Sequence, residues 1–174
     1  MSSFICEKIK KILRINHAGE YGAINIYSSQ IFVSGIFYRD IAPKLEEMLR
    51  HEKAHFKHFN NLLTQRNIRH CYALSIWGSC GFLLGFITAL MGRNAIWTCT
   101  DAIESTVLKH LERQLEFLSQ YDQEAYDTVL SIKADEESHR VFGQSNSTNT
   151  FLNKMLFNTV KLCTELAIWL GSRL

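Results

Sequence analysis

Apolar side chains recur along most of this chain every three or four residues, a spacing that places them on one face of a helix. Four long segments carry the pattern and are predicted as helices, at about 15–37, 43–66, 95–119 and 123–142. After a polar stretch that offers helix-capping residues, the same period continues over 151–172. No segment alternates apolar and polar residues with a period of two, so we expect an all-α fold.

The segment 71–91 has a different composition, because it contains no charged residue over 21 positions. That length is enough to cross a bilayer, but its glycines and serines make the segment only moderately hydrophobic. A true span would also place the helices before it and after it on opposite sides of the membrane. We therefore favour a bundle helix that also touches the bilayer, with a membrane span and a plain buried helix as the alternatives.

The first long helix is preceded by a short amphipathic segment, residues 5–13. Its apolar side chains have helical spacing: Ile5, Ile9, Ile12 and Leu13. The segment either docks on the protein as a terminal turn or lies on a membrane surface, and the pattern fits both interpretations equally well.

Composition and charge exclude several classes of protein. The 174 residues suit one domain with a substantial core. A net charge of +2 without a basic run argues against nucleic acid as a partner. Five scattered cysteines without a C-x-x-C pair indicate a reducing compartment and argue against a disulfide scaffold or a thiolate zinc site. We see neither a secretory signal nor an Arg-rich leader, and therefore expect a bacterial rather than a mitochondrial protein.

The chain contains two Glu-x-x-His motifs, Glu52–His55 and Glu136–His139. Residues three apart share a helix face, so the carboxylate and the imidazole can bind one ion. A further glutamate precedes each motif, Glu20 before the first and Glu104 before the second, and the separation along the chain is the same in both cases. The two halves therefore superpose with a single offset, and this repeat indicates two related helical hairpins.

The glutamates and histidines of this repeat extend the apolar faces of the predicted helices, so they point toward the expected core. A buried, unpaired carboxylate costs several kcal/mol, and four together require positive charge. Two ferrous ions would balance four carboxylates, and oxygen and nitrogen ligands without thiolates suit iron or manganese. Such a ligand set is typical of ferritin-like di-iron bundles. We therefore predict a di-iron centre with six ligands: Glu20, Glu52, His55, Glu104, Glu136 and His139.

Other titratable residues receive different interpretations. Asp135 and Glu137 flank a predicted ligand but should face solvent. Three histidines are interpreted as surface groups or as groups that support the ligands: His17, His51 and His58. His110 is either a hydrogen-bonding core residue or a proton or substrate contact near the site.

The segment 14–23, with the sequence RINHAGEYGA, closely resembles the opening motif of the demethoxyubiquinone hydroxylase family of ubiquinone biosynthesis. The resemblance continues through HEKAH at 51–55, AIE at 102–104 and EESH at 136–139. It extends to the C-terminal SRL and so covers nearly the whole chain.

Two positions depart from the family pattern. Asn16 stands where an aspartate is usual. His110 matches a family histidine, but the neighbouring Leu111 stands where the family often has a tyrosine thought to help pass electrons. The departure at Leu111 puts a tyrosine-assisted electron route in doubt and leaves the predicted metal site untouched.

The resemblance implies an oxygen-dependent di-iron monooxygenase that hydroxylates the ring of a polyprenyl methoxy-methyl benzoquinol and draws electrons from an external reductant. It implies a peripheral protein, on the cytoplasmic face of a bacterial inner membrane or, alternatively, on the matrix face of the mitochondrial inner membrane. Other ubiquinone-biosynthesis proteins are further expected partners. The apolar helix at 71–91, together with residues 5–13, would provide a doorway for the isoprenoid tail.

We accordingly expect one ferritin-like domain over residues 1–174, built from pseudo-repeats at about 15–66 and 95–142. Helices at about 71–91 and 151–172 are added to this bundle. Two other functional classes stay open. One is a ferroxidase or rubrerythrin-like peroxidase on the same fold, and the other is a non-catalytic quinone-binding helical protein.

Overall fold

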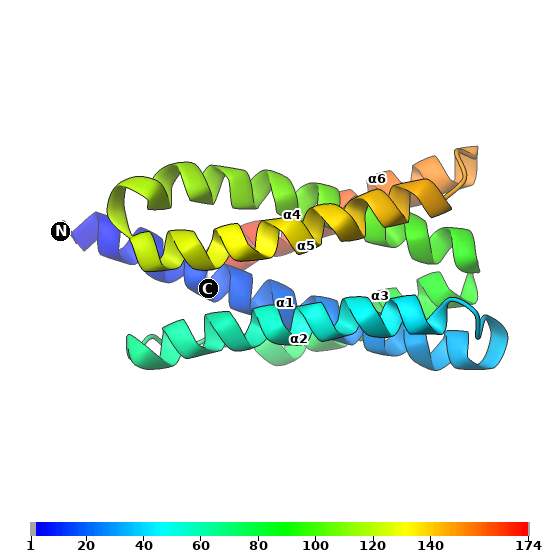
Figure 1. The fold of residues 1–174 in the computed structure, drawn as a ribbon, viewed down its shortest axis with the longest axis horizontal. Helices are drawn as coiled ribbons and strands as arrows, with labels where there is room; N and C mark the ends of the chain where they lie inside the picture. Colours follow the sequence, from blue (N-terminus) through cyan, green and yellow to red (C-terminus); the bar gives the residue numbers. More distant parts are fainter. Residues whose placement is uncertain (1–2, 174) are drawn as a thin grey trace.

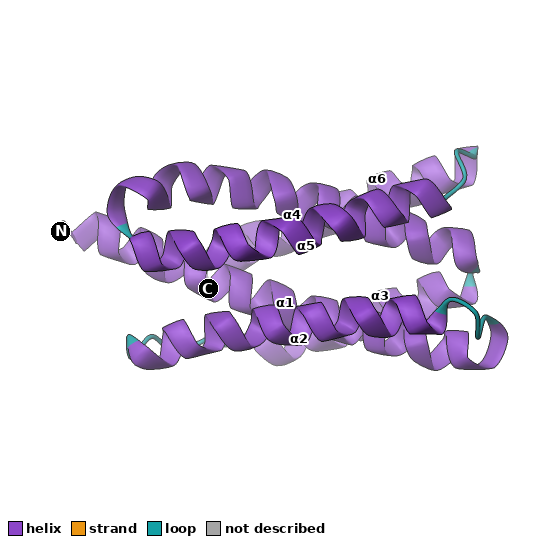
Figure 2. Ribbon diagram, viewed as in Figure 1, coloured by secondary structure: helices purple, strands orange, loops and turns teal. Residues whose placement is uncertain are grey.

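The computed structural model describes residues 3–173, so Leu174 of the C-terminal motif lies outside the described residues. The described chain folds into six helices and has no strand (Figures 1 and 2), which confirms the all-α prediction. The helices are α1 (Ser3–Phe37), α2 (Ala42–Gln65), α3 (Leu74–Leu90), α4 (Arg93–Tyr121), α5 (Gln123–Asn146) and α6 (Phe151–Gly171).

The helices run up and down along the long axis of the molecule (Figure 1). α1 packs against α2 and α4 packs against α5, so each half of the chain forms an antiparallel hairpin. α3 covers α1 and α6 covers α4, while α2 and α5 meet between the hairpins. The predicted bundle therefore consists of α1, α2, α4 and α5, with α3 and α6 added on its outside.

The amphipathic segment before the first predicted helix is the beginning of α1 itself. Its side chains Ile9, Ile12 and Leu13 are buried in an apolar cluster with Phe59 and Leu118 of other helices. The docked interpretation of this segment is therefore correct. The segment is also longer than a terminal turn, because α1 continues through it without a break.

Local chemistry explains several helix ends. Pro43 occupies the first turn of α2, where its missing N–H would have no partner in any case. Asp122 caps α5 by accepting a hydrogen bond from the backbone N–H of Ala125 at 3.1 Å. Thr150, from the polar stretch before α6, accepts from the backbone N–H of Asn153 at 3.2 Å. Gly92 turns the chain sharply between α3 and α4 with a φ of 108°.

The described core contains three apolar clusters, and a polar layer separates the two largest of them; the third, around Ile103, includes Val160 of α6. One of the two largest clusters contains the start of α1 and the ends of α2 and α4, including Leu13, Phe59 and Leu115. The other contains the opposite ends of the same helices, including Leu45 and Ile96. The mid-helix positions between the clusters hold the glutamates and histidines of the sequence repeat, so apolar packing above and below fixes the height of that layer.

α3 lies unusually close to α1. A Cβ atom added to Gly81 would lie 2.5 Å from the carbonyl oxygen of Gly22, and one added to Gly85 would clash with the carbonyl oxygen of Ile26. The buried side of α3 is therefore made of small residues, and its large apolar side chains point outward. None of the described helices combines the length and the hydrophobicity needed to cross a membrane.

Candidate metal centre

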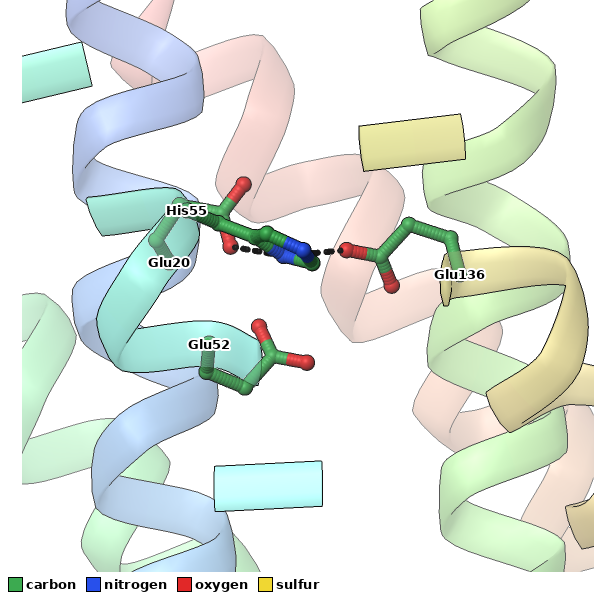
Figure 3. Close-up of side chains that lie close together, drawn as sticks. All are labelled: Glu20, Glu52, His55 and Glu136. Atoms are coloured by element: carbon green, nitrogen blue, oxygen red, sulfur yellow. Dashed lines mark ion pairs between the residues drawn. The ribbon is translucent and has the colours of Figure 1, made fainter. Parts of the chain in front are cut away.

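The six side chains of the sequence repeat meet in the polar layer of the bundle. Each is at most 6% exposed, although each carries a charged or titratable group. Figure 3 shows three of them from α1 and α2 pointing across the interior toward Glu136 of α5. The structure therefore brings together all of the predicted ligands: Glu20, Glu52, His55, Glu104, Glu136 and His139.

The six side chains form two overlapping groups, in each of which the potential ligand atoms lie within 4.8 Å of one another. We call the first group site A; it consists of Glu20, Glu52, His55 and Glu136. We call the second group site B; it consists of Glu52, Glu104, Glu136 and His139. Glu52 and Glu136 belong to both groups, so their carboxylates are placed to bridge two ions.

The two imidazoles turn the same nitrogen toward the interior. Nδ1 of His55 lies 3.1 Å from Oε1 of Glu136 and 3.6 Å from Oε2 of Glu20. Nδ1 of His139 lies 3.3 Å from Oε1 of Glu52. Both Nδ1 atoms, one oxygen of Glu52 and one of Glu136 are nevertheless buried without a hydrogen-bond partner. Buried polar atoms without partners are rare in native proteins, and here they converge as ligands of divalent cations would.

Electrostatics also favour cations at this place. Burial raises the pKa of Glu20, Glu52 and Glu104, because the charged carboxylate is poorly solvated there. For Glu136, burial alone would raise the pKa, but the imidazoles of His139 and His55 outweigh it and lower the pKa. Four buried carboxylates thus need protons or metal ions, and two divalent cations would balance their charge. The donor set of carboxylates and imidazoles fits iron or manganese.

The histidines respond to the same carboxylates. Burial would lower the pKa of both imidazoles, but the neighbouring carboxylates reverse its effect. Glu136 and Glu20 raise the pKa of His55 to about 11, and Glu136 and Glu52 raise the pKa of His139 to about 9. Without a metal, protons on these imidazoles neutralise part of the buried negative charge.

The outer nitrogen of each imidazole contacts a residue of the opposite hairpin. Nε2 of His55 lies 3.1 Å from Oδ2 of Asp135. Nε2 of His139 lies 3.0 Å from Nδ1 of His51, and the two rings are stacked. Such contacts orient metal-binding imidazoles in proteins. Asp135 is partly exposed, as expected, and its carboxylate also contacts His55, which was not predicted.

The other histidines occupy different surroundings. His17 is 1% exposed and its ring is stacked on Phe56, with centroids 4.3 Å apart. Neither ring nitrogen of His17 has a hydrogen-bond partner, so the interpretation of this residue as a surface or ligand-supporting group was wrong. His58 is exposed, as expected. The error arose because α1 begins at Ser3, well before the predicted start, which puts His17 in the middle of a buried helix.

Tyr27 is a contact that sequence reasoning missed. Its hydroxyl donates a hydrogen bond to Oε1 of Glu104 at 2.9 Å. Burial, followed by the charge of Glu104, raises the pKa of Tyr27 well above its usual value, so the phenol stays protonated and remains a donor. A signal was present, since Tyr27 lies two helical turns after Glu20 on the same face of α1.

A cavity of about 510 Å³ borders the polar layer. Carboxylates of both sites line one part of it, and apolar side chains of α3 and α6 line another. These apolar residues include Trp77, Leu84, Leu166 and Leu170. Leu83 and Leu166 line the cavity and are also exposed, so the cavity reaches the surface between α3 and α6.

Polar pairs interrupt the apolar wall of this cavity. Nε2 of His110 lies 2.9 Å from Oε2 of Glu165 on α6, so His110 is a hydrogen-bonding wall residue outside both metal sites. Asn16 and Gln114 exchange two amide hydrogen bonds of 2.8 and 2.9 Å across the same wall. The departure at Asn16 therefore joins α1 to α4 beside the cavity.

Comparisons with known proteins match nearly the whole chain. The family model described as "Ubiquinone biosynthesis protein COQ7" matches residues 7–171. The chain is 34% identical over 169 residues to the "NADPH-dependent 3-demethoxyubiquinone 3-hydroxylase, mitochondrial" of Dictyostelium discoideum, covering 95% of this chain and 77% of that protein.

Two further relatives come from distant organisms. The protein of the same name from Homo sapiens is 31% identical over 171 residues, covering 95% of this chain and 78% of that protein. The "3-demethoxyubiquinol 3-hydroxylase" of Rhodospirillum rubrum is 32% identical over 166 residues, with coverages of 95% and 78%. The matched regions include parts of all six helices.

Proposed function

Because this chain belongs to the COQ7 family of ubiquinone biosynthesis proteins, we propose that it hydroxylates the ring of a polyprenyl methoxy-methyl benzoquinol with O₂, using two iron ions. The observation that carries the proposal is the convergence of six buried side chains whose inward polar atoms include several without a hydrogen-bond partner. The named relatives are hydroxylases of demethoxyubiquinone or demethoxyubiquinol. The proposed reaction is therefore the one that their names describe.

Each hairpin supplies half of the proposed ligands. Glu20 and His55 would hold one ion in site A, Glu104 and His139 the other in site B, and the shared carboxylates would bridge them. When bound, a pair of iron ions supplies the activation of O₂ and the oxidation of the ring. The protein holds the ligands at fixed height between two apolar clusters, and these clusters exclude water from both ends of the layer.

The cavity supports a route for a substrate with a polar ring and an apolar tail. Its carboxylate end would receive the quinol ring, and its α3 and α6 walls would contact the first part of the isoprenoid chain. A volume of about 510 Å³ lies in the range of pockets for small molecules. The long remainder of the tail would stay outside.

The outer helices support attachment to a membrane surface. Large apolar side chains are exposed along both of them, among others Phe82, Leu90, Leu162 and Trp169. Patches of this kind mark interaction sites for proteins or membranes. We place the protein peripherally on a quinone-containing membrane, either the bacterial inner membrane at its cytoplasmic face or the mitochondrial inner membrane at its matrix face. Relatives from mitochondria and from a bacterium support keeping both compartments.

Electrons would come from outside the chain. Several relatives carry "NADPH-dependent" in their names, so a reduced nicotinamide is the first reductant to test. Other ubiquinone-biosynthesis proteins are the proposed partners that deliver the substrate or accept the product.

The test is a reaction of the iron-loaded protein with a demethoxy-quinol, O₂ and a reductant, analysed by mass. We expect a product heavier by one oxygen atom, carrying the label when ¹⁸O₂ is used. A protein that oxidises ferrous ion or consumes peroxide but never labels the ring would be a ferroxidase or a peroxidase, and the proposal would be wrong. Full hydroxylation by a metal-free protein would overturn the proposed cofactor.

A further inference from the structure

The repeat of the chain places two chemically different residues at equivalent positions beside the proposed iron ligands. His51 directly precedes the first Glu-x-x-His motif and Asp135 directly precedes the second, so the offset that superposes the two halves also superposes these two residues. We propose that they position the metal-binding imidazoles and make sites A and B unequal, so that site A binds the first metal ion more tightly. The inference rests on the proposed metal centre.

The geometry of the two contacts is nearly the same in both halves. Asp135 reaches from α5 to the outer nitrogen of His55 on α2, at 3.1 Å. His51 reaches from α2 to the outer nitrogen of His139 on α5, at 3.0 Å. Each supporting residue therefore crosses the interface between the hairpins to hold the histidine of the other motif. The two supports also approach each other, with Nδ1 of His51 4.0 Å from Oδ1 of Asp135.

The chemistry of the two contacts differs. An imidazole that binds a metal through Nδ1 keeps its proton on Nε2 and donates it to an acceptor. For His55 the acceptor is the carboxylate of Asp135, and a hydrogen bond to an ionised acceptor is roughly twice as strong as one between neutral groups. For His139 the acceptor is a ring nitrogen of His51, which carries no negative charge. His55 is consequently the more electron-rich ligand, although solvent reaches both supports, which are 45% and 34% exposed at their side chains.

A second difference between the sites acts in the same direction. Tyr27 donates its hydroxyl hydrogen to Glu104, the terminal carboxylate of site B. The position equivalent to Tyr27 in the second half of the repeat is Leu111, which has no hydroxyl to offer to Glu20 in site A. A hydrogen bond withdraws negative charge from a carboxylate, so Glu104 is the weaker ligand. Site A therefore has both the stronger imidazole and the stronger terminal carboxylate.

The experiment is a stepwise titration of the metal-free protein with cobalt(II), followed by its visible absorption. We expect two resolved binding steps. Asp135→Asn keeps the size of the side chain and removes its charge, and should weaken the first step about tenfold while leaving the second nearly unchanged. His51→Asp gives His139 a carboxylate acceptor and should strengthen the second step. Tyr27→Phe removes the donor to Glu104 and should also strengthen the second step.

Glu137→Gln is the matched control for Asp135→Asn. Glu137 lies on the same helix two residues away, and its carboxylate pairs outward with Arg140 at 2.6 Å. Its loss removes the same charge without touching an imidazole, so both binding steps should stay as in the original protein. The thermal unfolding of the metal-free Asp135→Asn protein should match that of the control, which separates positioning of a ligand from a general loss of structure.

The outcomes distinguish this inference from the proposal on which it rests. Two ions bound with equal affinity, or a loss in Asp135→Asn that falls on the second step, would overturn the inequality and leave the metal centre in place. A weakening of both steps that Glu137→Gln reproduces would do the same. A chain that binds no metal would overturn the proposed centre and the inference together.

Discussion

Soluble proteins usually bury apolar side chains and expose charged ones. The inner bundle and the outer helices depart from this pattern in opposite ways. In the bundle, charged side chains such as Glu52 and Glu136 are buried, each at most 2% exposed. On α3 and α6, large apolar side chains such as Leu83 and Leu162 are exposed, at 57% and 70%. Both arrangements cost free energy in water unless something outside the chain compensates. In the proposed function, cations compensate for the first arrangement and an apolar membrane phase for the second.

The reason for the difference lies in which side chains face inward. The bundle helices interrupt their apolar faces with polar residues halfway along, at Glu20 in α1 and at Glu104 in α4. α3 instead turns glycines and other small residues toward α1. In α6, Val160 is the one buried residue among those described. The outer helices therefore contribute little to the core and much to the surface.

The largest effect should follow from removing a carboxylate shared by both sites. Glu136→Ala takes a ligand from site A and from site B, so we expect iron per chain to fall steeply and hydroxylation to be lost. His139→Ala, which takes a ligand from site B alone, should also abolish hydroxylation while retaining more metal. Iron analysis and product analysis by mass measure both effects. Full activity of either variant would contradict the ligand assignment.

The next largest effect should appear at the outer surface. Phe82 and Leu90 on α3 are exposed and lie outside the residues that line the cavity. Burying one such side chain contributes about 1.5–3 kcal/mol, so Phe82→Ser with Leu90→Ser should reduce binding to lipid vesicles at least tenfold. Sedimentation with vesicles measures this binding.

A matched change on the bundle tests whether the effect belongs to α3. Leu130→Ser removes a similarly exposed apolar side chain from α5, and vesicle binding should remain. Iron content should stay normal in both proteins. Equal vesicle binding by the α3 double variant and the original protein would show that this face does not meet a membrane.

A smaller effect should come from His17, a buried imidazole that belongs to neither of the proposed metal sites. Burial, reinforced by the nearby His70, lowers the pKa of His17 to about 4. The unfolded chain therefore binds a proton that the folded chain excludes between pH 6.5 and 4, and stability falls as the pH falls through this range. At pH 5 the loss is about 2 kcal/mol relative to pH 7.

His17→Phe keeps the stacking on Phe56 and cannot titrate. The free energy of unfolding from urea denaturation should therefore decline less between pH 7 and 5 in this variant than in the original protein. Parallel pH dependences in the two proteins would mean that His17 is already accommodated as a cation in the fold.

The smallest effect should come from Asp122, a charged residue whose hydrogen-bond partners lie within the protein. Asp122 caps α5 and accepts a hydrogen bond from Arg66 of α2 at 3.0 Å. Asp122→Asn retains the capping oxygen and loses the charge, so the free energy of unfolding should fall by at most about 1 kcal/mol. Iron content should not change. A loss of iron would mean that this ion pair sets the spacing of the hairpins around the metal sites.

Much of this architecture could be predicted because the apolar period and the constant offset between the two halves are local properties of the sequence. They gave the all-α fold and the six side chains that meet inside, and the family match confirms the resemblance to demethoxyubiquinone hydroxylases. Helix ends were harder to predict. Gly143 resembled a break after 142, but α5 continues to Asn146 because this glycine lets α5 approach the backbone of α4 near Trp97.

The supporting contacts could not be predicted from spacing within one helix. Asp135 and Tyr27 act on residues of the opposite hairpin, and that pairing depends on how the hairpins face each other. The repeat does contain one indication of this pairing, because His51 and Asp135 occupy equivalent positions. A pair of unlike residues at equivalent positions was the available signal, and it becomes meaningful only when the interface is known.

The glycines that bring α3 against α1 also bear on how much of the proposed substrate has to enter the protein. Because the backbones of α3 and α1 touch at Gly81 and Gly22, α3 lies close against the bundle, and the cavity that it lines also reaches the carboxylates. A quinol in the proposed membrane-bound state would then advance only its ring and the nearest isoprene unit. The turnover rate should therefore not depend on the number of further isoprene units in the tail, and one protein could act on quinols of several chain lengths.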